Sequence, residues 1–291
     1  MQVSSPDSAP GGEWEIGPPS RVVPGRRAAM IGFRDRRESG LELRVADIPA
    51  VTVVIEFGGS GLTVEGAGGR RELTAFVAGC ASGAMRIGGA RPAWVEARLS
   101  PVQAYSLLGV APGELSGAVV DLTELWGPRA ELLRERLAAA ATWERRFALT
   151  EDFLTARADP ARAVDPEVAV SWRRIVTGRG QVRIDELAEA CGWSRKRLWA
   201  RFHAQIGLTP KRAAMLVRFR HAVDGLVAGG SAADIAACCG YTDQSHLGRD
   251  MSSFIGVTPA TLTREMLNPF SRRRHQAWGT FFLDRAEPAV R

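Results

Sequence analysis

The pattern of apolar and polar positions predicts short strands in the first part of the chain. Leu41–Val45 alternates apolar and polar residues, and Val51–Phe57 is β-branched and mostly apolar. Glycine-rich turns follow at Gly58–Gly61 and Gly66–Gly69. Further strands are predicted at Leu62–Val64, Thr74–Val77, Ala84–Ile87 and Trp94–Leu99. Several short strands at this spacing predict a β-rich barrel or sandwich.

After Pro101 the pattern becomes helical. Helices are predicted at Val102–Leu108, Glu131–Ala141 and Glu144–Arg157, the last of them amphipathic, and Ala158–Pro166 is the best candidate for a linker. Beyond it the pattern stays helical to about Met266. The predicted fold class is therefore α+β multidomain. We expect a disordered leader over residues 1–30, a β-rich domain with trailing helices over 31–160, an all-α domain over 161–266 and a tail of unassigned role over 267–291.

Two helices separated by a tight turn are predicted between Ile184 and Phe202. Gly192 ends the first helix, and Ser194 is a candidate N-cap for the second. In the second helix Leu198 and Phe202 lie four residues apart and face inward, which leaves a polar and basic outer face. This arrangement is typical of a helix-turn-helix motif, whose second helix reads base edges in the major groove.

The same pattern recurs further along the chain. Gly240 ends a short helix, and Thr242 or Asp243 is the candidate cap of the next; Asp243 follows Ser194 by 49 positions. Both units close with a Gly-x-Thr-Pro sequence, at Gly207–Pro210 and Gly256–Pro259. Between them Lys211–Val227 is predicted to form one long helix, which would hold the two recognition helices in a fixed relative placement.

Residues from about 170 to 266 resemble the DNA-binding domain of the AraC/XylS family of transcriptional regulators. Residues 235–249 read Ile-Ala-Ala-Cys-Cys-Gly-Tyr-Thr-Asp-Gln-Ser-His-Leu-Gly-Arg, which is close to the family signature. The order of strands and helices before this part is similar to a subgroup of the family that is common in actinobacteria. The resemblance implies that both recognition helices enter successive segments of the major groove on one face of DNA.

By position, the resemblance implies DNA contacts for residues of both recognition helices. The candidates are Ser194, Arg195, Lys196, Trp199 and Arg201 in the first unit, and Gln244, Ser245, Gly248 and Arg249 in the second. Two positions depart from the family. Ala200 stands where a basic residue is common, with Arg201 beside it as a substitute, and Gly248 has no side chain to read a base. Trp199 either packs on DNA or is buried against Cys191.

The charge distribution separates the two parts of the chain. The formal net charge is +6. Residues 171–291 carry 19 basic and 10 acidic side chains, whereas residues 1–170 carry 19 and 22. A basic C-terminal part indicates contact with a polyanion there. For Arg218 and Arg220 two roles stay open, a phosphate contact or, for Arg220, an ion pair with Asp224 four residues later.

The sequence indicates no membrane segment, cofactor or metal site. No apolar run reaches about 18 residues, the first forty residues contain several acidic side chains and lack an apolar signal core, and the histidines show no metal-ligand spacing. The cysteines, Cys80, Cys191, Cys238 and Cys239, are expected to be reduced and buried. We therefore expect a cytoplasmic, non-enzymatic protein that binds double-stranded DNA.

The role of the N-terminal part stays open at this point. By resemblance it senses a small-molecule effector, forms a homodimer, or both, and RNA polymerase is a further candidate partner. The alternative is a ligand-independent regulator whose N-terminal part makes protein contacts alone. An enzyme of the alkyl-transfer repair type would need an activated cysteine, and no neighbouring His or metal set supports Cys80 in that role.

Overall fold

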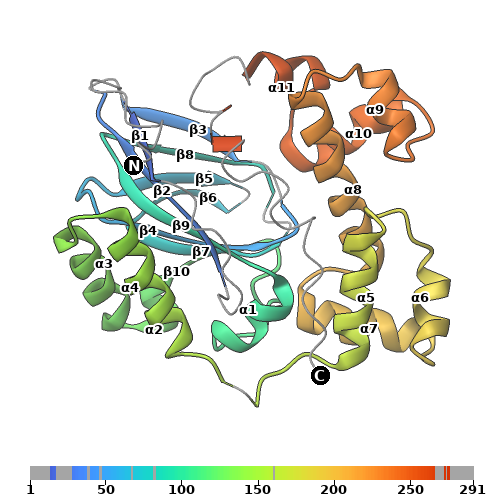
Figure 1. Ribbon diagram of the computed structural model, residues 1–291, viewed down its shortest axis with the longest axis horizontal. Helices are drawn as coiled ribbons and strands as arrows, with labels where there is room; N and C mark the ends of the chain where they lie inside the picture. The colour runs from blue at the N-terminus through green and yellow to red at the C-terminus, as the bar shows by residue number, and fades with distance from the viewer. Residues whose placement is uncertain are drawn as a thin grey trace, which may run out of the picture.

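The computed structural model describes residues 14–17, 28–37, 40–45, 48–66, 68–80, 83–159, 161–265, 272 and 274–275. Within these ranges a β-rich part with trailing helices precedes a helical part, as Figure 1 shows. The α+β multidomain prediction is therefore confirmed. None of the helices in the described ranges combines the length and apolar character needed to cross a membrane.

Two antiparallel sheets form a sandwich rather than a closed barrel. The six-stranded sheet has the order β1 (Trp14–Gly17), β2 (Ala29–Asp35), β9 (Ala93–Leu99), β4 (Val51–Glu56), β7 (Ala75–Ala78) and β10 (Val119–Asp121). The four-stranded sheet has the order β3 (Leu41–Val45), β8 (Met85–Gly89), β5 (Leu62–Gly66) and β6 (Gly69–Leu73). Buried side chains from both sheets meet in one core, among them Phe33, Leu62 and Phe76. Alternation along each strand places these side chains on the inner faces.

Helices cover the other face of the six-stranded sheet (Figure 1). They are α1 (Pro101–Leu107), α2 (Leu122–Trp126), α3 (Pro128–Ala139) and α4 (Trp143–Thr155). Trp143 begins α4 and lies flat against β1 and β2. A Cβ added at Gly32 would lie 2.1 Å from Cε3 of Trp143, so glycine at this position makes room for the indole ring. This close approach sets the position of α4 on the sheet.

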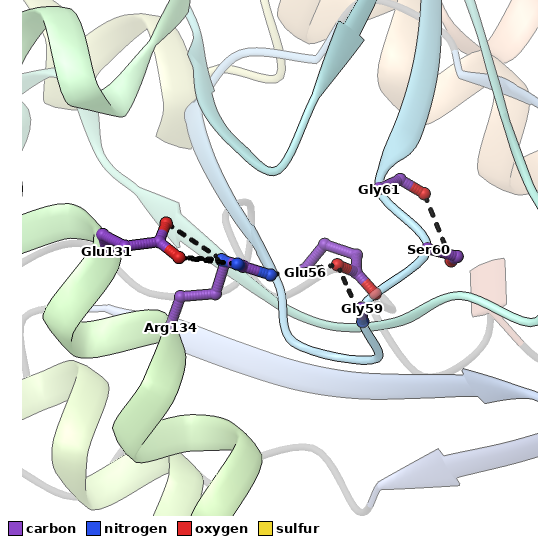
Figure 2. Close-up of polar contacts among 6 residues, drawn as sticks. All are labelled: Glu56, Gly59, Ser60, Gly61, Glu131 and Arg134. Atoms are coloured by element: carbon purple, nitrogen blue, oxygen red, sulfur yellow. Dashed lines mark hydrogen bonds and ion pairs between the residues drawn. The ribbon is translucent and has the colours of Figure 1, made fainter.

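Polar contacts link α3 to the end of β4 (Figure 2). Arg134 donates hydrogen bonds to Glu131 and lies 3.8 Å from Oε2 of Glu56, which is fully buried. The same carboxylate oxygen accepts from the backbone N–H of Gly59 at 3.3 Å. An arginine and a turn amide therefore compensate Oε2 of the buried carboxylate, whereas Oε1 has no hydrogen-bond partner among the described residues.

The helical part is built around one long helix, α8 (Pro210–Val227). At one end lie α5 (Pro166–Thr177), α6 (Ile184–Ala190) and α7 (Arg195–Ile206); at the other lie α9 (Ala232–Cys238), α10 (Gln244–Ile255) and α11 (Pro259–Glu265), as Figure 1 shows. Helix α7 of the first unit contacts α8, and in the second unit both α9 and α10 contact it. The predicted connecting helix therefore joins two helix-turn-helix units.

The β-rich part contacts the first unit directly. Helix α1 packs against α7, and the turn after α1 meets the C-terminal end of α7. Gly207 ends α7 with φ +83°, and a Cβ there would lie 2.5 Å from the carbonyl oxygen of Pro112. Backbone lies against backbone at this contact, so its geometry is tightly defined.

Two details differ from the sequence-based expectations. Within the leader predicted as disordered, Trp14–Gly17 forms β1 and pairs with β2, because Trp14 and Ile16 pack against the sandwich core. All four cysteines are free, but Cys238 is exposed, and Cys191 and Cys239 are half-buried, so only Cys80 is a fully buried thiol as expected. The tail predicted over residues 267–291 lies outside the described residues except at 272 and 274–275.

Candidate nucleic-acid interface

Side-chain caps begin both candidate recognition helices. Ser194 Oγ accepts from the backbone N–H of Arg197 at 3.2 Å, at the start of α7. Asp243 Oδ1 accepts from the backbone N–H of His246 at 2.7 Å, at the start of α10. These bonds satisfy amide groups that a helix N-terminus otherwise leaves unpaired. Of the two candidates for the N-cap of α10, Thr242 and Asp243, the N-cap is Asp243.

The inward faces of both helices are buried as predicted. Leu198, Phe202, Leu247 and Met251 each have 0% exposure. In the second unit Phe254 stacks on Phe219 of α8, with ring centres 4.8 Å apart. These contacts fix the rotation of each recognition helix about its own axis, and so determine which side chains face solvent.

The outward face of α7 carries the candidates of the first unit. Ser194, Arg195, Lys196, Trp199 and Arg201 are all exposed. Trp199 is 53% exposed and stacks on His203, with ring centres 5.3 Å apart and an interplanar angle of 4°. The interpretation of Trp199 as buried against Cys191 is therefore wrong, because the ring lies on the solvent side of α7.

Two arginines of this face are engaged within the protein. Arg195 contacts Asp185 of α6. Arg201 donates two hydrogen bonds to Asp165, at 2.6 and 2.7 Å, and these bonds lower the pKa of the Asp165 carboxyl. Asp165 belongs to the linker, directly before α5. Arg201 thus ties the first recognition helix to the linker, whereas Lys196 and Trp199 project from the exposed surface of α7.

The outward face of α10 carries the candidates of the second unit. Gln244, Ser245 and Arg249 are exposed, and Gly248 is half-buried. A Cβ added at Gly248 would meet nothing within 4 Å, so this position is open surface. His246 lies edge-on to the Tyr241 ring at 5.1 Å, and its Nδ1 is 3.4 Å from Thr242. The role of His246 visible in the structure is to support the turn.

The arginines of the connecting helix are internal. Arg220 pairs with Asp224 at 2.8 Å, which decides between the two roles left open for it. Arg218 lies 3.4 Å from Asp250 and 4.4 Å from the centre of the Tyr241 ring. Burial raises the pKa of Tyr241 well above its usual range. Arg218 therefore contacts α10, and Arg220 is paired within α8, so both are engaged inside the protein.

One exposed cation was missed in the sequence. Arg197 lies on the outer side of α7, with its guanidinium 4.5 Å from the centre of the Trp193 ring. The spacing of four residues between Trp193 and Arg197 is a recognisable signal for such a pair. A cation held over an aromatic face keeps a defined position, so Arg197 joins Lys196 as a candidate phosphate contact.

Comparison with known proteins identifies the helical part. Residues 187–265 match a family described as a helix-turn-helix domain. A search of the curated proteins gives no match.

Several solved structures are similar to the chain. The C-terminal domain of AraT, a response regulator from Geobacillus stearothermophilus, is 19% identical over 35% of this chain and 87% of that one, with a TM-score of 0.33. An apo variant of ToxT from Vibrio cholerae is 10% identical over 87% of this chain and 97% of that one, with a TM-score of 0.46. ToxT from the same organism bound to an unsaturated fatty acid is 12% identical over 77% and 93%, with a TM-score of 0.41. Over residues 187–265, the C-terminal part of the chain is a helix-turn-helix domain of the AraC type.

Proposed function

We propose that the protein is a sequence-specific DNA-binding regulator of transcription, with α7 and α10 as its two recognition helices. One observation carries this proposal. Two capped helices of equal length bury their apolar faces against the same long helix and leave their polar faces exposed. A short helix with a polar outer face, supported from behind, fits the major groove of duplex DNA.

The exposed side chains divide into two chemical classes. Gln244 can pair with adenine N6 and N7, and Arg249 can donate two hydrogen bonds to guanine. Lys196 carries a compact charge without a planar match to a base, and Arg197 is held against the Trp193 ring, so we assign both to phosphate contacts. We assign Trp199, which is flat and exposed, to apolar contact with a sugar or a thymine methyl group.

The test is selection of bound duplexes from a random pool with the full-length protein. We expect one recurrent sequence, and a repeated half-site if two copies of the chain bind together. Gln244→Ala should relax selectivity at one base position by ~1–3 kcal/mol. Gln103→Ala, on α1 in the β-rich part, is the matched control and should leave the selected sequence unchanged. Recovery of no preferred sequence by the wild-type protein would contradict the proposal.

We further propose that the β sandwich senses a small-molecule effector. A cavity between the sheets, of about 30 Å³, supports this role. Pockets for drug-sized molecules measure roughly 300–1,000 Å³, so the effector is a smaller molecule or displaces side chains of the wall. The alternative is a regulator that needs no ligand. A sensor of a small molecule should show a rise in Tm when its ligand is added, whereas a regulator that needs no ligand should show none. RNA polymerase remains a candidate partner in both.

A further inference from the structure

A turn closed by the same hydrogen bonds precedes each helix-turn-helix unit. Residues 178–181 lie before α6, and residues 228–231 lie before α9. In both turns the N–H of the third residue donates to the carbonyl oxygen five residues earlier, at 2.8 Å in the first turn and 3.0 Å in the second. The second residue is left-handed in both turns, but it is Gly229 in the second (φ +95°) and Arg179 in the first (φ +52°). Glycine takes this conformation without steric cost and arginine does not, so the backbone of the turn does not account for the arginine.

Contacts on two sides fix the position of the first turn. A Cβ added at Gly180 would lie 2.1 Å from the carbonyl oxygen of Ala214, so the backbone of the turn lies directly on α8. Nε2 of Gln181 donates to the carbonyl oxygen of Cys238 at 3.4 Å, and a Cβ added at Gly240 would lie 2.8 Å from Oε1 of Gln181. Cys238 ends α9, and Gly240 lies in the turn between α9 and α10. The turn before the first unit therefore lies against the turn of the second.

This position is between the two recognition helices, on the side that approaches DNA. The N-terminal residues of a recognition helix reach the base edges, and Gly240 lies shortly before Asp243, the N-cap of α10. Recognition helices in successive major-groove segments are about 34 Å apart along the duplex. Because the duplex completes one turn over this length, the DNA between the two segments turns its minor groove and the bordering phosphates toward the protein.

The side chain of Arg179 is available for such a phosphate. It is exposed, and its guanidinium has no acidic partner within the part of the chain that the structure describes. Arg195 and Arg201, by contrast, pair with aspartates. Burial raises the pKa of the Cys239 thiol and the charge of Arg179 opposes this rise, so the guanidinium lies near the second unit. A guanidinium can donate two parallel hydrogen bonds to a phosphate.

We propose that Arg179 binds a phosphate group of the DNA between the two major-groove segments. The inference rests on the proposed function and adds to it a contact outside both recognition helices. A phosphate contact carries no sequence information, but it fixes where the protein lies along the duplex. Because the turn contacts α8 and the second unit at once, a phosphate bound there is positioned relative to both recognition helices.

The first test is the salt dependence of DNA binding by the full-length protein, on the selected duplex and on a random one, between about 50 and 200 mM salt. Arg179→Gly reproduces the glycine of the second turn and so keeps the fold, which thermal unfolding checks. Loss of one phosphate contact lowers the slope of log Kd against log salt by about 0.9. We therefore expect binding to weaken roughly three- to tenfold near 0.1 M salt, with a loss about three- to fourfold larger at the low end of the range than at the high end.

Three further variants separate the charge from the backbone. Arg179→Asn also removes the charge and tolerates the left-handed conformation, so it should behave like Arg179→Gly. Arg179→Lys retains the charge and should retain the slope. Arg145→Ala removes an exposed arginine from α4 in the β-rich part and should change neither Kd nor the slope. Equal affinity and slope for Arg179→Gly and the wild-type protein, or an equal loss in Arg179→Lys, overturns the contact.

The second test locates the contact on the DNA by ethylation of single phosphates in the selected duplex. We expect ethylation of a phosphate between the two recognised segments to weaken binding by the wild-type protein and by Arg179→Lys, but not by Arg179→Gly. Loss of sensitivity only inside or beyond those segments overturns the placement. If the wild-type protein selects no sequence, the proposed specificity fails, and the salt series on the random duplex still decides whether Arg179 binds phosphate.

Discussion

The exposed side chains of the two recognition helices differ in the contacts they make within the protein in the absence of DNA. Arg249 and Gln244 lie on an open face, whereas Arg201 is bound to Asp165 by two hydrogen bonds. Side chains that are already positioned lose less conformational entropy on binding, but Arg201 would have to leave Asp165 first. We therefore assign Arg201 to holding the linker against α7 rather than to base reading.

The ion pair of Asp165 predicts a pH dependence of stability. Arg201 lowers the pKa of Asp165 below its ordinary 3.8, so the contact stabilises the folded protein above that value and is lost as the pH falls through the lowered pKa. Asp165→Asn should lower the free energy of unfolding at pH 7, and its deficit should shrink between roughly pH 5 and 3. Urea unfolding at both ends of this window measures the effect. A deficit independent of pH would show that Arg201 does not stabilise the charged form.

Gly248 allows a separate prediction on α10. A Cβ there meets nothing within 4 Å, and glycine inside a helix is about 1 kcal/mol less favourable than alanine. Gly248→Ala should therefore raise the free energy of unfolding by about 0.5–1 kcal/mol. Chemical denaturation of the full chain tests this. A loss of stability instead would mean that another segment of the chain lies against this face.

At the scale of elements, local signals predicted the helical part better than the sheets. The turns of both helix-turn-helix units depend on glycines and capping side chains within a few residues, so the sequence shows them directly. β3 was predicted with its observed bounds, because Leu41–Val45 alternates strictly. β6, at Gly69–Leu73, was missed because its residues are polar and mostly exposed; pairing with β5 makes it a strand.

Long-range contacts set the limit of prediction from sequence. Arg274 meets Glu96 across 178 positions, and no local pattern around either residue indicates the partner. β2 was also missed, since Ala29–Asp35 lacks the alternation of a half-buried strand and lies between β1 and β9. The candidate DNA contacts could be named from sequence, but the engagement of Arg195 and Arg201 by acidic neighbours depends on how α5, α6 and α7 pack.

The cap of α10 gives a prediction at this scale. Asp243 supplies an acceptor to an amide that would otherwise be unpaired at the helix start. Asp243→Ala should lower the free energy of unfolding by about 1 kcal/mol, and Asp243→Asn, which retains a capping oxygen, by much less. Equal losses for both variants in urea unfolding would show that negative charge, rather than the hydrogen bond, stabilises this end of α10.

On the scale of the whole molecule, the charge is divided between a slightly acidic part and a basic one. Residues 171–291 hold a net charge of +9, against −3 for residues 1–170. Several arginines of the basic part are paired internally, including Arg218 and Arg220. These pairs are neutral, so the net charge resides on the other basic side chains, among them the exposed Lys196, Arg197 and Arg249.

This distribution predicts how one substitution should change the salt dependence of DNA binding. Association should weaken linearly in log Kd with log salt, because each phosphate contact releases counterions. If Arg249 reads a base, Arg249→Ala should weaken binding to the selected duplex by ~1–3 kcal/mol and leave non-specific binding and the salt slope nearly unchanged. Arg136→Ala on α3 removes the same charge from an exposed site in the β-rich part and is the matched control. Equal loss on both kinds of DNA, with the slope reduced by about one, would place Arg249 on a phosphate instead.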